Sequence, residues 1–61
     1  MPRNMIPDGL VVVTAGAMKG KPGFIHEDHG GDTVVIEISS GTIQKRRNEF
    51  RPFTLEDMIV L

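Results

Sequence analysis

From residue 8 onward the chain alternates, every few residues, between runs of strand-forming residues and turns rich in glycine. Short β-branched runs bounded by glycine and proline are typical of strands rather than helices. With 61 residues in all, the chain has room for a single small domain. An open sheet of this size would leave long unpaired edges, so closure into a small barrel or rolled sheet is expected. The predicted strands are residues 10–14, 24–27, 33–39, 42–47 and 58–61.

The clearest strand is residues 33–39, where Val34, Ile36 and Ile38 alternate with more polar positions. A period of two predicts that these three side chains share the core-facing side of a sheet. Ser40-Gly41 is expected to form the two-residue turn that leads into the next strand. Residues 15–23 contain three glycines and a proline, which predicts a loop that packs close to backbone.

The chain end is predicted to add a capped helical turn at residues 54–57 before the last strand. The first strand can be placed with Leu10 and Val12 inward or, alternatively, with Val11 and Val13 inward. The predicted core residues are Leu10, Val12, Ile25, Val34, Ile36, Ile38, Ile43, Phe50, Phe53, Ile59 and Leu61.

Residues 8–25 resemble the KOW motif: a strand, a glycine turn, a basic residue followed by glycine, and a second glycine two positions before an apolar residue. Gly16, Lys19-Gly20, Gly23 and Ile25 fill these positions. The motif occurs in SH3-like barrels of ribosomal large-subunit proteins and of the C-terminal domains of transcription elongation factors. The layout is also similar to the soluble domain of the preprotein translocase accessory subunit. The resemblance covers about residues 8–53 and implies an all-β fold, a small five-stranded SH3-like barrel over residues 8–61 behind an N-terminal extension, residues 1–7.

The net charge is −1, from seven basic and eight acidic residues, and so gives no reason to expect a polyanionic partner. The basic residues are nevertheless clustered in two segments, which predicts a patch that binds phosphates. With the KOW resemblance, this suggests RNA, or a ribosome-associated or RNA polymerase-associated protein, as the partner. Lysine and arginine that protect an edge strand are the alternative explanation. The candidate binding residues are Lys19, Lys21, Lys45, Arg46, Arg47 and Arg51.

A different function, a protein-protein interaction adaptor or accessory subunit of a larger assembly encoded by a phage or mobile element, also fits the small size and low net charge. Val35 lies between two apolar neighbours, and Val60 lies in an equally apolar run. One-sided strands would leave these two side chains outward, where they could pair with another copy of the chain. Val35 and Val60 are therefore the candidate self-association residues.

His26 and His29 lie with three carboxylates in residues 26–32 and are weak candidates for metal ligands. Their spacing is not that of a helical zinc motif, and the chain has no cysteine, so a solvated acidic turn is favoured and no cofactor is predicted. No serine or threonine has a base at a known catalytic spacing, and the Gly20-Lys21 pair lacks the rest of a P-loop. The sequence therefore favours a protein that is not an enzyme.

The longest apolar runs, residues 10–13 and 58–61, are four residues each, whereas a membrane helix needs about 20. The N-terminus lacks the apolar core of a signal peptide. The absence of cysteine fits a reducing compartment. The expectation is a cytoplasmic protein with no membrane partner.

Overall fold

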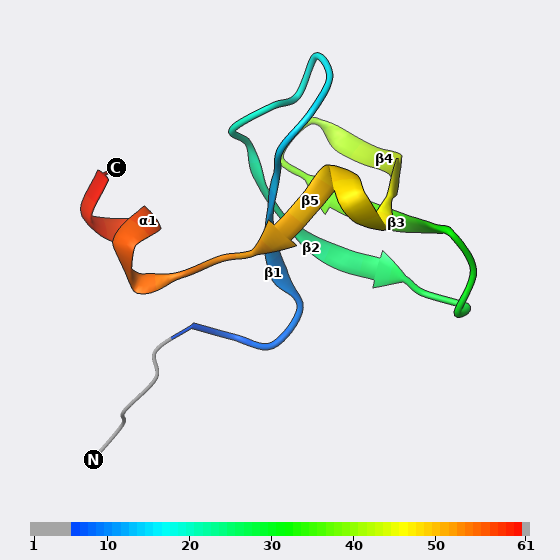
Figure 1. Cartoon of the computed structure of the whole chain (residues 1–61), viewed down its shortest axis with the longest axis horizontal. Coiled ribbons are helices and arrows are strands. Elements are labelled where there is room, and N and C mark those ends of the chain that lie inside the picture. Colours follow the sequence, from blue (N-terminus) through cyan, green and yellow to red (C-terminus); the bar gives the residue numbers. More distant parts are fainter. Residues whose placement is uncertain (1–5, 61) are drawn as a thin grey trace.

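The structure is a computed structural model that describes residues 6–60, the side chain of Val60 excepted. Its five strands form one antiparallel sheet in the order β4-β3-β2-β1-β5 (Figure 1). Four strands follow one another as a meander, and the fifth returns to pair with the other side of β1. The domain is thus a small, barrel-like, all-β domain whose sheet is not closed. The elements are β1 (Leu10–Val13), β2 (Pro22–Glu27), β3 (Thr33–Ile38), β4 (Gly41–Arg46), the 3-10 helix η1 (Arg47–Glu49), β5 (Phe50–Pro52) and α1 (Leu55–Val60).

The prediction of a fifth strand at residues 58–61 is wrong over the described residues, because residues 58–60 belong to α1, while Leu61 lies outside them. The Asp57 carboxylate accepts hydrogen bonds from the backbone N–H and the hydroxyl of Thr54, at 2.7 and 3.0 Å, and so caps the first turn of this helix. The fifth strand is instead Phe50–Pro52. It lies at the edge of the sheet, where a proline costs no ladder hydrogen bond.

The core is confirmed where β3 alternates: Val34, Ile36 and Ile38 are all buried. Both parities of β1 are buried, since Val11, Val12 and Val13 are each less than one tenth exposed. Ile59, predicted to be in the core, is 82% exposed because α1 extends from the side of the sheet (Figure 1). The other predicted core residues within the described chain are only half-buried: Leu10, Ile25, Ile43, Phe50 and Phe53.

Gly23 allows β2 to lie unusually close to β3. It pairs with Val11 in β1, and a Cβ atom at this position would lie 2.7 Å from the Glu37 carbonyl oxygen and 2.7 Å from Cγ2 of Ile36. Real Cβ atoms do not approach other atoms so closely, so only glycine fits without a backbone shift. The pairing register of β2 with β3 also shifts between Ile25 and Glu27. A bulge of this kind bends a strand and so curls the sheet.

Candidate nucleic-acid interface

Two of the predicted binding residues form bidentate ion pairs, in which both Nη atoms of the arginine bond to one carboxylate. The first of them is Arg47. Its Nη1 donates to Asp28 Oδ2 at 3.1 Å and its Nη2 to Asp28 Oδ1 at 2.5 Å, while its Nε donates to the Gly31 carbonyl at 2.7 Å. These bonds join η1 to the turn between β2 and β3. The Arg47 guanidinium and the Gly30 N–H lower the pKa of the Asp28 carboxyl, and the same ion pair raises the pKa of Arg47. Arg47 is therefore occupied by a structural contact.

The second paired residue is Arg51 on β5. Its Nη1 and Nη2 donate to the two carboxylate oxygens of Asp57, at 2.9 and 2.8 Å, and so attach α1 to the edge of the sheet. The Arg51 guanidinium, with the bonds from Thr54, holds the pKa of Asp57 well below its usual range. The sequence separates these partners by only six positions, but nothing in the local pattern distinguishes a bidentate pair from two solvated charges.

Lys45 is partly withdrawn from the surface. Its side chain is 15% exposed, and its Nζ lies 4.0 Å from a carboxylate oxygen of Glu49. A Cβ atom at Gly16 would lie 2.8 Å from this Nζ, which shows that Lys45 reaches the loop between β1 and β2. The structure therefore brings Lys45 to the loop that carries Lys19 and Lys21.

That loop is anchored at both ends. The Gly20 N–H donates to the Val13 carbonyl at 2.7 Å, and the Val13 N–H donates to the Lys21 carbonyl at 2.9 Å. Lys19 and Lys21 are exposed on it. Arg46, at the end of β4, is also exposed, and within residues 6–60 none of these three side chains forms an ion pair. They are the cations that a partner could neutralise.

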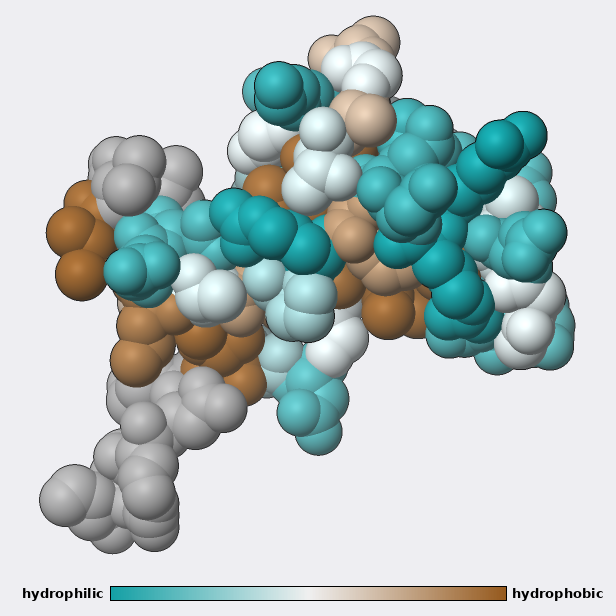
Figure 2. Space-filling view, in the orientation of Figure 1, coloured by the Kyte–Doolittle hydropathy of each residue, from teal (hydrophilic) through white to brown (hydrophobic). Residues whose placement is uncertain are grey.

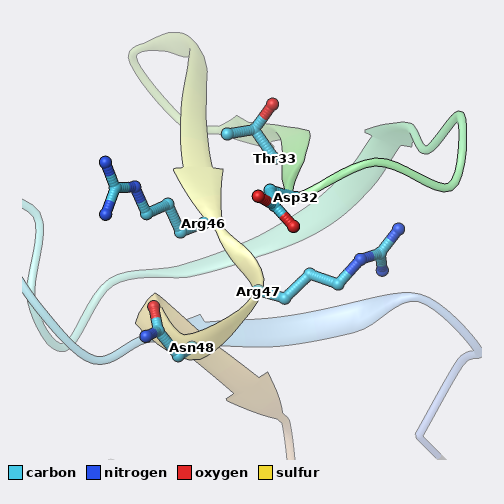
Figure 3. Close-up of a pocket in the computed structure, with 5 residues that line it drawn as sticks. All are labelled: Asp32, Thr33, Arg46, Arg47 and Asn48. Carbon is cyan, nitrogen blue, oxygen red and sulfur yellow. The ribbon is translucent and has the colours of Figure 1, made fainter.

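Arg46, the last residue of β4, and Arg47, the first residue of η1, point in opposite directions (Figure 3). Between them is an open polar hollow of about 570 Å³, lined by Asp32, Thr33, Arg46, Arg47 and Asn48. The sequence had indicated no role for Thr33 or Asn48. The signal that could have found Thr33 is the register of the β3–β4 hairpin, which makes Thr33 and Arg46 direct cross-strand partners.

The histidines lie apart from this hollow. His29 Nε2 is 3.3 Å from a carboxylate oxygen of Glu27, and His26 is exposed on β2. Asp28 is occupied by Arg47 and by the Gly30 N–H. Within the described part of the chain, no three histidine, cysteine or acidic side chains are grouped as metal ligands would be.

Large apolar side chains are exposed at positions other than the predicted Val35 and Val60. The exposed large hydrophobic residues are Phe24 at 46%, Leu55 at 53%, Met58 at 51% and Ile59 at 82%. Phe24 borders a groove of about 310 Å³ whose walls include Leu10, Pro22 and Glu37. Figure 2 shows hydrophobic side chains gathered at the end of the molecule that α1 occupies. Of the two predicted self-association residues, Val35 is half-buried in β3, and the side chain of Val60 lies outside the described residues.

The lowered pKa of Asp28 predicts acid sensitivity. A carboxyl whose folded-state pKa lies below its ordinary value of 3.8 contributes stability that is present above that value and lost as the pH falls through the folded-state pKa. Asp28→Asn should therefore lower the urea midpoint at neutral pH, and the difference from the unmodified protein should shrink below about pH 4. Circular dichroism in urea measures both midpoints. Asp8→Asn, on an exposed turn, is the control, and a difference independent of pH would contradict the assignment.

Over the residues that the structure describes, no helix is long and apolar enough to cross a membrane. No family model, curated protein or solved structure matches this chain. The residues of the surface determine its chemistry. That chemistry comprises three exposed cations without ion-pair partners in the described structure, a polar hollow beside one of them, and a separate apolar surface.

Proposed function

We propose that this domain is a small binding module without enzymatic activity, and that it contacts RNA of the transcription or translation machinery through Lys19, Lys21 and Arg46. The observation that carries the proposal is that these three exposed cations form no ion pair within residues 6–60, whereas Arg47 and Arg51 are held by carboxylates. Surface cations without an ion-pair partner contribute most to the affinity for a polyanion, because they neutralise its phosphates and release the counterions bound there. The proposed location is the cytoplasm, which fits a chain without cysteine.

The proposed similarity to KOW-type SH3-like barrels is supported by the roles of the motif's glycines. Gly16 and Gly20 both have φ of +89°, a conformation that other residues rarely adopt, and Gly23 is packed against β3. The strand order also supports it, because a four-strand meander is followed by a short 3-10 helix and a last strand beside the first. Each of these three glycines thus has a structural role at its position.

Salt dependence of RNA binding tests the proposal. Each phosphate neutralised on a single strand contributes about −0.7 to the slope of log affinity against log salt, so three cations predict a slope of about −2. Fluorescence anisotropy with a short labelled single-stranded RNA measures it. Arg46→Ala should reduce the magnitude of the slope by about 0.7. Arg51→Gln is the control and should leave the slope unchanged. Binding that is undetectable or insensitive to salt would reject the proposal.

The second candidate function is a protein-protein adaptor, and the exposed apolar residues of α1 favour it. Leu55, Met58 and Ile59 stand at i, i+3 and i+4 and so lie on one side of the helix. Glu56 on α1 and Glu37 at the Phe24 groove are exposed acids that form no ion pair in the described structure. If a second copy of the chain bound here, the glutamates of the two copies would face and repel each other. The partner that this surface fits is therefore an apolar segment that carries lysine or arginine.

A further inference from the structure

The polar hollow between β3, β4 and η1 brings together four kinds of polar group. Thr33 and Arg46 face each other across the β3–β4 ladder. The backbone N–H of Arg47 donates to the Asp32 carbonyl at 3.0 Å, which fixes the residue that carries the carboxylate. Asn48 follows on η1. A volume of about 570 Å³ lies within the range of small-ligand pockets and is enough for one nucleotide unit.

Two of these groups are available to bind a phosphate. Arg46 has no ion-pair partner within residues 6–60. Thr33 Oγ1 accepts a hydrogen bond from the Gln44 side-chain amide at 2.9 Å, so its own hydroxyl proton is left to donate. Arg47 also lines the hollow, but its guanidinium is turned to Asp28 and Gly31. The anion site therefore depends on Arg46 and Thr33.

Asp32 does not fit a site for phosphate alone. Its carboxylate lies between the two arginines (Figure 3), and within the described residues it forms no ion pair. A carboxylate repels a phosphate at close range, but it accepts hydrogen bonds from a neutral donor. The ligand that satisfies both groups carries an anion and a hydrogen-bond donor within one small unit.

A ribonucleotide carries such a pair, because its 2′-hydroxyl stands beside the phosphodiester, and that hydroxyl is what separates RNA from DNA. We propose that the hollow binds one ribonucleotide unit, with Arg46 and Thr33 on the phosphate and Asp32 accepting from the 2′-hydroxyl. The domain then prefers RNA to DNA without reading a base. This inference rests on the proposed RNA-binding function and adds to it a source of discrimination.

The test compares one sequence as RNA, as DNA and as 2′-O-methyl RNA, which keeps the oxygen but has no proton to donate. A hydrogen bond to a charged group predicts about tenfold tighter binding of the RNA than of either other polymer. Asp32→Ala should bring this ratio close to one, chiefly by tightening the binding of DNA, since a repelling charge is removed. Asp8→Ala removes one negative charge from an exposed turn and should leave the ratio unchanged.

The outcomes separate this inference from the function on which it rests. Equal affinity for RNA and DNA, or an RNA preference that persists in Asp32→Ala, overturns the role of Asp32. Neither result contradicts RNA binding through Lys19, Lys21 and Arg46. No binding of any of the three polymers overturns both. Circular dichroism checks that the variant is folded. If Asp32→Ala unfolds the domain, Asp32→Asn keeps the size of the side chain without its charge and should lower the ratio in the same direction.

Discussion

Replacing Gly23 with alanine is expected to lower the free energy of unfolding by about 2 kcal/mol. The new Cβ would stand 2.7 Å from the Glu37 carbonyl oxygen, which is backbone and cannot rotate away, and as close to Cγ2 of the fully buried Ile36. Part of β2 must therefore move away from β3. For a domain of this size, each kcal/mol shifts the melting temperature by roughly 4–8 °C. Thermal unfolding followed by circular dichroism measures the change.

Gly31→Ala is the matched control. Gly31 has no positive φ, and a Cβ atom at this position would meet no atom within 4 Å. Its replacement should change the free energy of unfolding by less than about 0.5 kcal/mol. If the Gly23 and Gly31 variants melt at the same temperature, the close packing of β2 on β3 is not a determinant of the fold.

Met58→Glu is expected to weaken the binding of a protein partner to the α1 surface by at least about 30-fold, which is the effect of losing a hot-spot residue. Met58 is half exposed between Leu55 and Ile59 on the same side of the helix, so a charge there disrupts the whole apolar surface. The measurement is capture of partners by immobilised protein, with and without nuclease treatment. A partner retained after nuclease digestion and lost with Met58→Glu supports the adaptor function.

Ala17→Glu places the same charge on the exposed loop after β1 and should leave such capture unchanged. Partners that disappear on nuclease digestion, whichever variant is used, indicate that nucleic acid holds them. That result would favour the RNA-binding function and argue against the adaptor.

The sequence predicted the elements whose signal is periodic. Within residues 33–39 every second residue is a large aliphatic one, and β3 is found at Thr33–Ile38 with Val34, Ile36 and Ile38 buried. The prediction of a last strand at residues 58–61 was wrong for a physical reason. Ile59 and Val60 are strong strand formers, but the cap made by Thr54 and Asp57 and the ion pair of Asp57 with Arg51 favour a helix. The capped turn at residues 54–57 was predicted from the sequence, but the continuation of the helix through Val60 was not, because strand propensity at residues 58–60 does not reflect these contacts.

The candidate site was harder to predict because it depends on register. The expected turn at Ser40-Gly41 would have placed Thr33 opposite Asn48, whereas Ile38 pairs with Gly41 and Thr33 therefore faces Arg46. A register change of this size decides which groups share the hollow. The pairing of Arg47 with Asp28, 19 positions earlier, becomes visible only once three strands are aligned. Composition identified the basic residues but could not show which of them were already occupied.

The pairing of the first strand with the last has a consequence for how the protein emerges from the ribosome. Val12 pairs with Arg51, 39 positions later, so one edge of β1 has no strand to pair with until residues 50–52 have been made. Nascent β1 to β4 can form a meander, yet the valine-rich first strand then offers its open edge to other chains. Completion of the sheet therefore waits for the synthesis of residues 50–52, and any pause before them would prolong the interval in which the chain is most prone to aggregate.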